Sequence, residues 1–358
     1  MSAFNMAVSH GSARRRGRGV LLAGLSLLLA STSACTQADA PVASASAASS
    51  AAAQAGPIRA FGNLTVFEFA PVFIAAESYY PALVTLGRGS VANLVGEPGA
   101  TPDDTSEPAD IATNAETQAL RYSLRNPEMR IIMTVTEGLY RIVARKSAGI
   151  NSLADLKGKR IATISVTSSG FFTQKMLKTV GLSSDDVTMV GMKLPDMPQA
   201  LADRKVDAVA IWEPEVERAA QAIGDDAIEF SGKGVYRELF NLNTTAGALA
   251  DPQMRRNIVV MVRAIIDATQ EVRRDPTRAQ QLVAQHSGYP LELVKQSWSH
   301  HNWLADWTGD LLDVLEEEEA WLAKQDKRTP RTRAQLATLI DTSILEEAKA
   351  LPPLPKRN

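Results

Sequence analysis

The chain has 358 residues, of which 45% are apolar and 22% charged, and its formal net charge at pH 7 is −2. This composition is ordinary for a globular protein with one or two cores, and the balanced charge gives a nucleic-acid-binding surface no electrostatic support. After the N-terminal segment, no apolar run approaches the length that a membrane-spanning helix needs.

The first 34 residues have the layout of an export signal. Four arginines between residues 14 and 18 precede an apolar stretch over residues 20–30, and small residues then lead to the chain's single cysteine, Cys35. A cysteine in this place is similar to the lipidated cysteine of bacterial lipoproteins, although Thr32 replaces the usual leucine. We expect a signal peptide over residues 1–34 and an anchor of two or more acyl chains on Cys35; plain secretion with an idle thiol is the alternative.

The segment after Cys35 is almost entirely alanine and serine, with some glutamine, aspartate and proline. Such a segment cannot bury enough apolar surface to offset the entropy of ordering, so we predict a disordered tether over residues 35–57. A single cysteine also excludes a disulfide framework and a cysteine-based metal cluster.

Strands and helices alternate over residues 58–140. Residues 63–69 alternate as in a strand, and Pro71 suits the first turn of a helix that runs to about residue 80. The remaining predicted elements are strands over 82–86, 110–113 and 130–135, a loop over 87–107 and a helix over 116–124. This order is typical of an α/β fold.

Residues 141–240 show the same alternation, and a helical segment follows them. The predicted strands are 161–166, 187–192, 208–211 and 227–230, and the predicted helices are 171–180, 198–203, 215–223, 252–273, 277–286, 291–299, 309–324 and 332–350. We therefore predict two α/β lobes, with lobe one formed by residues 58–140 and 241–358 and lobe two by residues 141–240.

The turn at residues 167–170 (TSSG) opens a predicted helix directly after a predicted strand. Its three hydroxyls, together with the unpaired N–H groups of the helix start, can hold an anion or a carbonyl oxygen without a basic side chain. The plain alternative is a helix cap, which contributes on the order of 1 kcal/mol and needs only one hydroxyl.

The motifs around this turn carry a resemblance to a known family. They are GINSLADLKGKR at residues 149–160, the TSSG turn, VDAVAIWEP at 206–214, DIATNAE at 110–116 and EGLYRIVAR at 137–145. Together they resemble the nitrate/sulfonate/taurine group of ABC-transporter substrate-binding proteins, over nearly all of the chain after the tether. Arg204 departs from the pattern, because relatives usually have a helix-ending glycine there, so we expect this helix to end differently.

The resemblance implies a type II periplasmic binding protein fold, with a hinged cleft between two mixed-sheet lobes and a helical C-terminal extension packed on lobe one. It implies capture of a small organic solute, of the sulfonate, taurine or nitrate type or like a thiamine precursor, and delivery to a separate permease and ATPase. The protein would be a periplasmic monomer anchored through Cys35, with no enzymatic activity, cofactor, metal or nucleic-acid partner. The expected ligand contacts lie at strand ends and helix starts: Phe69, Ala70, Asn114, Glu116, Thr167, Ser168, Ser169, Gly170, Trp212 and Glu213.

Several of these residues have a structural alternative. Trp212 ends an apolar strand and would equally serve as a core residue. Glu116 and Glu213 lie at helix starts, where the helix dipole favours a carboxylate by about 0.3–1 kcal/mol without any ligand.

The acidic residues near the predicted cleft bear on the charge of the ligand. If Glu68, Glu116, Glu137 and Glu213 approach one cleft, an anion there would meet like charges, and two unit charges about 4 Å apart repel by roughly 4 kcal/mol. Unless an arginine neutralises them, the ligand is predicted to be neutral or cationic; the candidates are Arg88, Arg121 and Arg141.

Other features of the C-terminal part have structural interpretations. His300 and His301, adjacent on a predicted helix, would point in different directions, and the nearby tryptophans would pack the helices onto lobe one. Residues 316–319 (EEEE) are predicted to form a solvated helix face, and residues 352–355 a frayed tail.

Two other functions stay open besides an importer component. The chain has no P-loop, no zinc-binding HExxH pair and no GxSxG elbow, which disfavours common enzymes. Fungal thiamine-pyrimidine synthases resemble this fold, but they work inside the cell and use cysteine- and histidine-rich segments. A sensor that presents its ligand to a membrane kinase is the second rival.

Overall fold

The computed structural model describes residues 54–97 and 107–357. The expected signal peptide, Cys35 and the tether up to residue 53 lie outside the described residues, as does the middle of the predicted loop over 87–107. Residues 54–57, the end of the expected tether, make hydrogen bonds: Gly56 donates its N–H to Asn257 at 2.8 Å and accepts one from the Tyr80 hydroxyl at 2.6 Å.

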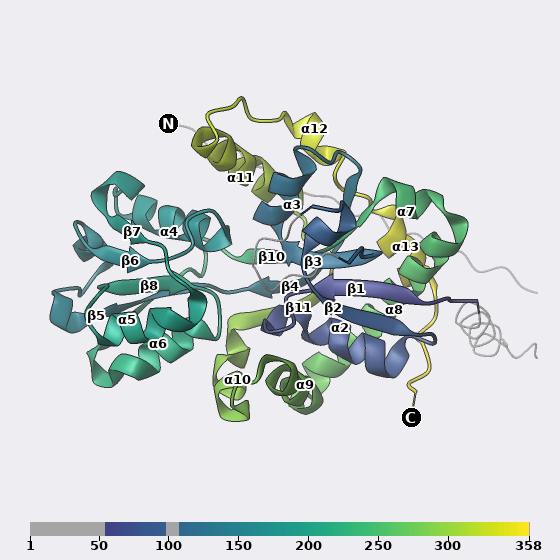
Figure 1. The fold of residues 1–358 in the computed structure, drawn as a ribbon, viewed down its shortest axis with the longest axis horizontal. Helices are drawn as coiled ribbons and strands as arrows, with labels where there is room; N and C mark the ends of the chain where they lie inside the picture. The colour runs from purple at the N-terminus through teal and green to yellow at the C-terminus, as the bar shows by residue number, and fades with distance from the viewer. Residues whose placement is uncertain (1–53, 98–106, 358) are drawn as a thin grey trace, which may run out of the picture. The chain divides into compact units, whose positions relative to one another are not determined.

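A six-stranded mixed sheet is built from both ends of the described chain (Figure 1). The N-terminal strands β1, β2 and β3 run parallel, whereas β10 is antiparallel to β3 and β4, and β11 is antiparallel to β4. In sheet order the strands are β11 (His301–Asp306), β4 (Met129–Gly138), β10 (Glu238–Thr245), β3 (Ile111–Ala115), β1 (Ile58–Gly62) and β2 (Val84–Arg88).

A five-stranded mixed sheet is built from the middle of the chain, drawn in teal at the left of Figure 1. Strands β6, β7 and β8 are parallel, and β5 is antiparallel to β8 and β9. In sheet order the strands are β7 (Thr188–Val190), β6 (Arg160–Ala162), β8 (Ala208–Ile211), β5 (Arg141–Arg145) and β9 (Ala227–Ser231). All five residues of β5 and all four of β8 are buried, as expected for central strands covered on both faces.

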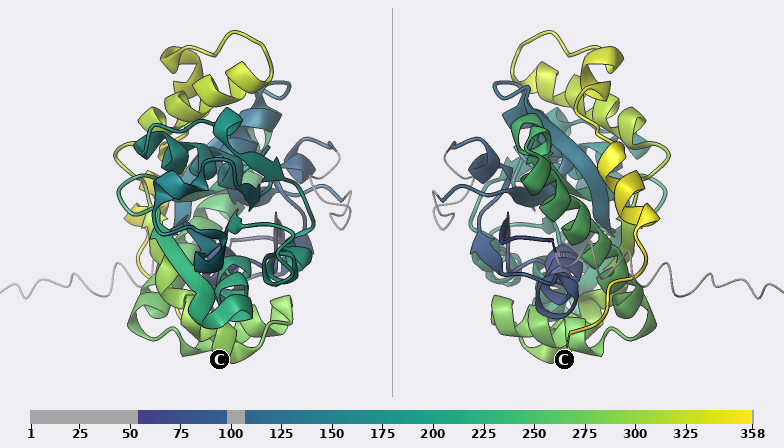
Figure 2. Two further views of the ribbon diagram at one scale, coloured as in Figure 1. Left: turned by 90° about the vertical axis from the view of Figure 1, so that its left-hand side faces the viewer. Right: turned by 90° about the vertical axis from the view of Figure 1, so that its right-hand side faces the viewer.

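The helices follow from local signals that the sequence carries. Pro71 lies in the first turn of α2, as predicted, and Asp251 caps α8 by accepting a hydrogen bond from the Met254 N–H at 2.6 Å. The long helix α8 buries an apolar stripe against the first sheet, and α13 lies along it (Figure 2). The helices are α2 (Ala70–Ile74), α3 (Glu116–Ser123), α4 (Ser168–Thr179), α5 (Met197–Ala202), α6 (Glu215–Ile223), α7 (Ala246–Ala250), α8 (Pro252–Arg274), α9 (Thr277–Ser287), α10 (Leu291–Ser297), α11 (Leu311–Gln325), α12 (Arg333–Ala337) and α13 (Ser343–Ala350).

The chain passes between the two sheets twice, through segments that we call the crossings: residues 139–140 after β4 and residues 232–237 before β10. The two crossings lie side by side, because Glu238 pairs with Gly138 in the sheet and the Gly232 N–H donates to the Tyr140 carbonyl oxygen at 2.8 Å. Gly232 is needed for this approach, since a Cβ there would lie 2.8 Å from the same oxygen.

One hydrophobic cluster spans both sheets and the crossings. Phe171 of α4 packs against Tyr236 of the second crossing and against Trp321 of α11, with ring centroids 5.8 and 5.2 Å apart. The middle of the chain is therefore packed against the C-terminal helices.

Arg204 corrects one expectation about a helix end. It adopts the left-handed conformation (φ 61°), and its neighbour Lys205 donates a hydrogen bond to the Ala200 carbonyl at 2.9 Å, so α5 ends in the Schellman arrangement that a glycine would favour. The prediction of a different ending is wrong, because these hydrogen bonds hold the turn despite the steric cost to arginine.

Two C-terminal expectations are also wrong. His301 was expected on a helix, but it begins strand β11, which pairs with β4. Buried residues alternate along β11, as they should in a strand. The tail at residues 352–355 is held in place, because Leu354 is 5% exposed and its N–H donates to Asp267 at 2.9 Å. Among the described residues, no helix is both long enough and apolar enough to cross a membrane.

Gly170, in the first turn of α4, permits a close approach that can be tested. A Cβ on this residue would lie 2.3 Å from the Ser165 carbonyl oxygen, which is backbone and cannot move aside cheaply. We expect Gly170→Ala to lower the free energy of unfolding by about 1–3 kcal/mol in urea titrations. Gly191→Ala is the matched control, because its Cβ would meet nothing within 4 Å; equal stability of the two variants would contradict this account.

Candidate functional site

Two buried tyrosines lie in the crossings and join predicted site residues from different elements. Tyr140 and Tyr236 have ring centroids 5.5 Å apart, in an edge-to-face arrangement. The Tyr140 hydroxyl lies 3.1 Å from the Ser168 hydroxyl at the start of α4, and the Tyr236 hydroxyl donates to Glu116 at the start of α3 at 2.7 Å. The crossings thus bring Ser168 and Glu116 to one place between the sheets.

Glu116 meets a second carboxyl group, that of Glu318 in α11. Glu116 also accepts a hydrogen bond from the Leu239 N–H at 2.9 Å, whereas no donor among the described residues reaches either oxygen of Glu318. Burial raises the pKa of both carboxyl groups, and the charge of Glu116 raises that of Glu318 further. Both shifts favour a state in which one of the two carboxyl groups holds a proton.

Glu68 and Glu238 complete a group of four acids that we call the carboxyl cluster: Glu68, Glu116, Glu238 and Glu318. Burial raises the pKa of Glu238 well above its ordinary value, and the charges of Glu68 and Glu116 add to the effect. Gly138 makes room for this pair, since a Cβ there would lie 2.8 Å from a Glu238 oxygen and 3.3 Å from a Glu68 oxygen. Glu68 also lies 3.4 Å from Nε2 of the buried His301.

The three hydroxyls of the predicted turn at residues 167–170 make different contacts. Thr167 caps α4 by accepting from the Ser169 N–H at 3.4 Å, and the Ser169 hydroxyl lies 3.2 Å from that of Thr163. Of the three hydroxyls, that of Ser168 contacts the crossings. Ser168 and Ser169 are 2% and 0% exposed, so the turn is closed over.

Glu213 belongs to a separate ion-pair group around Arg141. The Arg141 guanidinium donates to Glu213 at 2.9 Å and also pairs with Glu217 and Glu229 at 2.5 and 2.7 Å. His300 lies 3.8 Å from Glu213, and burial together with the charge of Arg141 lowers the pKa of His300 to about 4, so it is neutral at neutral pH.

Two of the four acids that the sequence singled out are thus neutralised. Glu213 is paired with Arg141, one of the three arginines named as candidates, and Glu137 is paired with Arg237 at 2.5 Å. Glu68 and Glu116 remain in the carboxyl cluster, without an arginine or lysine partner among the described residues.

The remaining predicted contacts are engaged in packing. Phe69 and Ala70 are fully buried, with the Phe69 ring 4.9 Å from that of Phe73. Asn114 accepts a hydrogen bond from the Ala115 N–H at 2.8 Å, and the half-buried Trp212 packs against all three hydrophobic clusters of the described residues. Their contact with a ligand stays a prediction.

The sequence reasoning missed Tyr140, Tyr236, Glu238 and Glu318. A signal for Glu318 was available, because positions 315, 318, 319 and 322 have the spacing of one helix face and two of them are leucine. The predicted solvated face at 316–319 is wrong in half of its residues: Glu318 and Glu319 are 0% exposed, and Glu319 accepts a hydrogen bond from Arg331 at 2.9 Å. Within the described residues, no group of three or more histidine, cysteine, aspartate or glutamate side chains is arranged to hold a metal ion.

The family of the chain is shown by comparison with family models. The model described as NMT1/THI5 like matches residues 97–279, which is just over half of the chain. The chain belongs to the NMT1/THI5-like family. Among curated proteins, one from Brucella abortus (strain 2308), named "Putative binding protein", is 35% identical over 74 residues, which is 21% of this chain and only 23% of the length of that protein.

Solved structures of similar fold support the architecture. The alkanesulfonate-binding protein SsuA from Xanthomonas axonopodis pv. citri has a TM-score of 0.61 at 16% identity, covering 80% of this chain and 98% of that one. The periplasmic nitrate-binding protein NrtA from Synechocystis PCC 6803 has a TM-score of 0.60 at 12% identity, with 85% and 93% covered. The desulfurization enzyme DSZB has a TM-score of 0.53 at 15% identity, with 82% and 99% covered. The fold is that of the type II periplasmic binding proteins, with two mixed sheets, as the sequence predicted.

Glu318 and Glu319 are adjacent buried acids for which we expect opposite pH effects on stability. The raised pKa of Glu318 means that the folded protein holds a proton that the unfolded chain releases, so this contribution to stability falls as the pH rises above 4.5. Glu319 has a pKa lowered to about 2, against the effect of burial, by its hydrogen bonds to Arg328 and Arg331, so its contribution is lost as the pH falls from 4.5 towards 2.

Urea titrations of two variants from about pH 2.5 to about pH 8 measure this difference. Glu318→Gln should be at least as stable as the unsubstituted protein at pH 8 and should show a flatter fall of stability with rising pH. Glu319→Gln should lose about 1–3 kcal/mol at neutral pH, because Arg328 and Arg331 lose a buried charged partner. A loss of the same size in both variants at pH 8 would show that Glu318 is ionised and paired.

Proposed function

We propose that this chain is the substrate-binding component of an ABC importer, which captures a small organic solute outside the cytoplasm and delivers it to a membrane permease. The observation that carries the proposal is the gathering of polar side chains from both sheets at the two crossings, above all the Tyr140–Ser168 and Tyr236–Glu116 contacts. In a receptor of this fold, the crossings are the segments that bend when the two lobes open and close. The family and the similar structures support the same role.

The proposed mechanism is capture by closure, with no chemistry on the ligand. Lobe one (58–140 and 241–358) and lobe two (141–240) separate to admit the solute and close around it. Opening would break the contacts that join the helices of the two lobes, such as Tyr289 to Glu215 at 2.6 Å and Lys175 to Glu317 at 2.7 Å. Gly234 of the second crossing already has φ +79°, a conformation that other residues adopt only with strain, and it supplies part of the freedom that bending needs.

The proposed ligand contacts are the ten residues expected from the sequence, together with Tyr140, Tyr236 and Glu238. The carboxyl cluster favours a neutral or cationic solute that donates hydrogen bonds, such as an amine or a nitrogen heterocycle, over nitrate, taurine or another sulfonate. An anion placed about 4 Å from one ionised carboxylate loses roughly 4 kcal/mol, and the Arg141 charge is already shared among three carboxylates.

Location and partners follow from this role. We propose a periplasmic protein that is anchored as a lipoprotein through Cys35 and that acts as a monomer with a separate permease and ATPase. Because the fold is similar to that of the desulfurization enzyme DSZB, a test of the function should also measure whether the ligand is chemically changed. A ligand sensor would bind in the same way but would act on a membrane kinase.

The function is tested by the solute that the protein carries. We expect native mass spectrometry of gently purified protein to show one small molecule per chain, released unchanged on denaturation. In a thermal-shift panel, amines and nitrogen heterocycles should raise the melting temperature more than nitrate or simple sulfonates. Stabilisation by several acids and by no amine or heterocycle would contradict the proposed charge preference, and a chemically altered solute would favour an enzyme.

The place of binding is tested by a matched pair of tyrosine variants. Tyr236→Phe removes a hydroxyl that donates to Glu116 at 2.7 Å, and Tyr79→Phe removes one that donates to Glu271 at 2.8 Å, away from the crossings. We expect Tyr236→Phe to weaken binding of the identified solute roughly tenfold in calorimetry, the worth of one hydrogen bond to a charged group, and Tyr79→Phe to leave it unchanged. Equal affinities of the two variants would place the solute elsewhere.

A further inference from the structure

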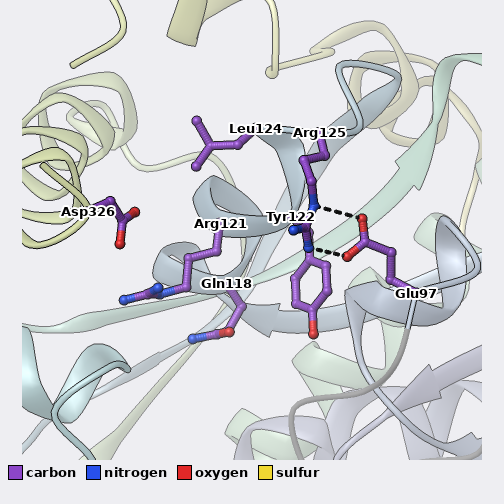
Figure 3. Close-up of a pocket in the computed structure, with 7 residues that line it drawn as sticks. All are labelled: Glu97, Gln118, Arg121, Tyr122, Leu124, Arg125 and Asp326. Carbon is purple, nitrogen blue, oxygen red and sulfur yellow. Dashed lines mark hydrogen bonds and ion pairs between the residues drawn. The ribbon is translucent and has the colours of Figure 1, made fainter. Parts of the chain in front are cut away.

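The outer face of α3 carries a pocket that is separate from the carboxyl cluster. It has a volume of about 430 Å³, which is within the range of small-molecule sites. Gln118 and Arg121 of α3, three residues apart on one face of the helix, line it together with Tyr122 and Leu124 (Figure 3). Glu116, which belongs to the carboxyl cluster, lies at the start of the same helix.

Gln118 is a largely buried residue, 8% exposed, that lines the pocket. No hydrogen bond from another described residue reaches its amide oxygen or nitrogen. Neither amide atom is fully enclosed, so both are open to solvent or to a ligand in the pocket. Gln118 therefore faces the pocket as an open hydrogen-bonding site.

Arg121 beside it makes no ion pair with an acid among the described residues. Its guanidinium makes one long contact, 3.5 Å to the Gln325 side chain, and its buried Nε has no acceptor among the described residues. Burial lowers the pKa of Arg121, and the charge of Asp326, which also lines the pocket, offsets part of this shift. Arg121 is not needed to cap α3 either, because Arg331 donates to the Leu120 carbonyl at 2.9 Å.

The other charges around the pocket are already paired. Glu97 accepts hydrogen bonds from Arg125 at 2.6 Å and from Asn126 at 2.8 Å, as the dashed lines to Arg125 in Figure 3 indicate. Asp326 lies 3.5 Å from Nε of Arg328. Among the described charged residues that line the pocket, Arg121 is thus the one that makes no ion pair, although Asp326 attracts it from a longer distance.

We propose that this pocket binds a small organic carboxylate, whose two oxygens take the free donors of Arg121 and Gln118. A guanidinium fork and an adjacent amide match the geometry of a carboxylate. Leu124, 38% exposed, and the Tyr122 side chain supply an apolar wall for the body of the ligand. The site is independent of the proposed solute site at the crossings, and its occupation does not require the lobes to move.

Titration with benzoate tests the proposal, with benzamide as an uncharged molecule of the same shape. We expect saturable benzoate binding in calorimetry that is roughly tenfold tighter than benzamide binding, and a loss of about tenfold or more in Arg121→Met. Arg130→Met is the matched control, because Arg130 is also half-buried and also makes no ion pair among the described residues, but bonds the Pro127 and Met129 carbonyls outside the pocket; it should bind as the unsubstituted protein does.

Two further variants serve as a replacement and a control for the Arg121 substitution. If Arg121→Met fails to fold, as circular dichroism would show, Gln118→Met takes its place and should weaken benzoate binding several-fold. Tyr236→Phe, at the crossings, should leave benzoate binding unchanged, so that failure here and failure of the proposed importer function are distinguishable. Equal benzoate affinity with and without the Arg121 substitution, no saturation, or equal binding of benzamide would each overturn the proposal.

Discussion

The structure depends on how two short crossings connect two sheets and give most of the buried polar groups between them a partner. The Tyr140 and Tyr236 rings stack edge to face at this point, and their hydroxyls reach outward to Ser168 and Glu116. Each tyrosine therefore serves the hydrophobic cluster with its ring and a buried polar residue with its hydroxyl. Pairing of Gly138 with Glu238 fixes the distance between the crossings, and the glycines there leave room for the neighbouring groups.

Buried acids are handled in two different ways in this protein. Glu213, Glu137 and Glu319 each have an arginine within about hydrogen-bond distance. The arginines lower the pKa of Glu319, whereas burial raises the pKa of Glu213 in spite of Arg141. Glu116, Glu238 and Glu318 have no arginine partner among the described residues, and burial raises their pKa so that protonation relieves part of the cost. In the proposed receptor, this second group is the one that exchanges hydrogen bonds with the solute.

The fold and the function rest on different kinds of support. Membership of the NMT1/THI5-like family and the match to periplasmic binding proteins define the architecture, but similar structures at 12–16% identity include an enzyme as well as receptors. The side chains at the crossings therefore carry the proposal of a receptor. The Gln118–Arg121 pocket adds a second polar site on α3, whose first residue, Glu116, belongs to the carboxyl cluster.

The sequence by itself determined most of the helices, the strands β2, β3, β4 and β6 to β9, the Pro71 helix start, the α4 start at the hydroxyl turn and the family, because these depend on residues close together in the chain. The strand predicted over 63–69 is wrong, since β1 ends at Gly62 and a 3₁₀ turn follows at Phe67–Phe69. It also named Glu116 and Ser168, whose positions at helix starts are local signals. Only the tertiary structure decided which acids gain an arginine partner, since Arg141 meets Glu213 and Arg331 meets Glu319 through contacts distant in the sequence or across a turn. It likewise decided that the run at 316–319 is half buried, because burial of a helix face depends on what packs against it, and that Arg204 holds a left-handed turn.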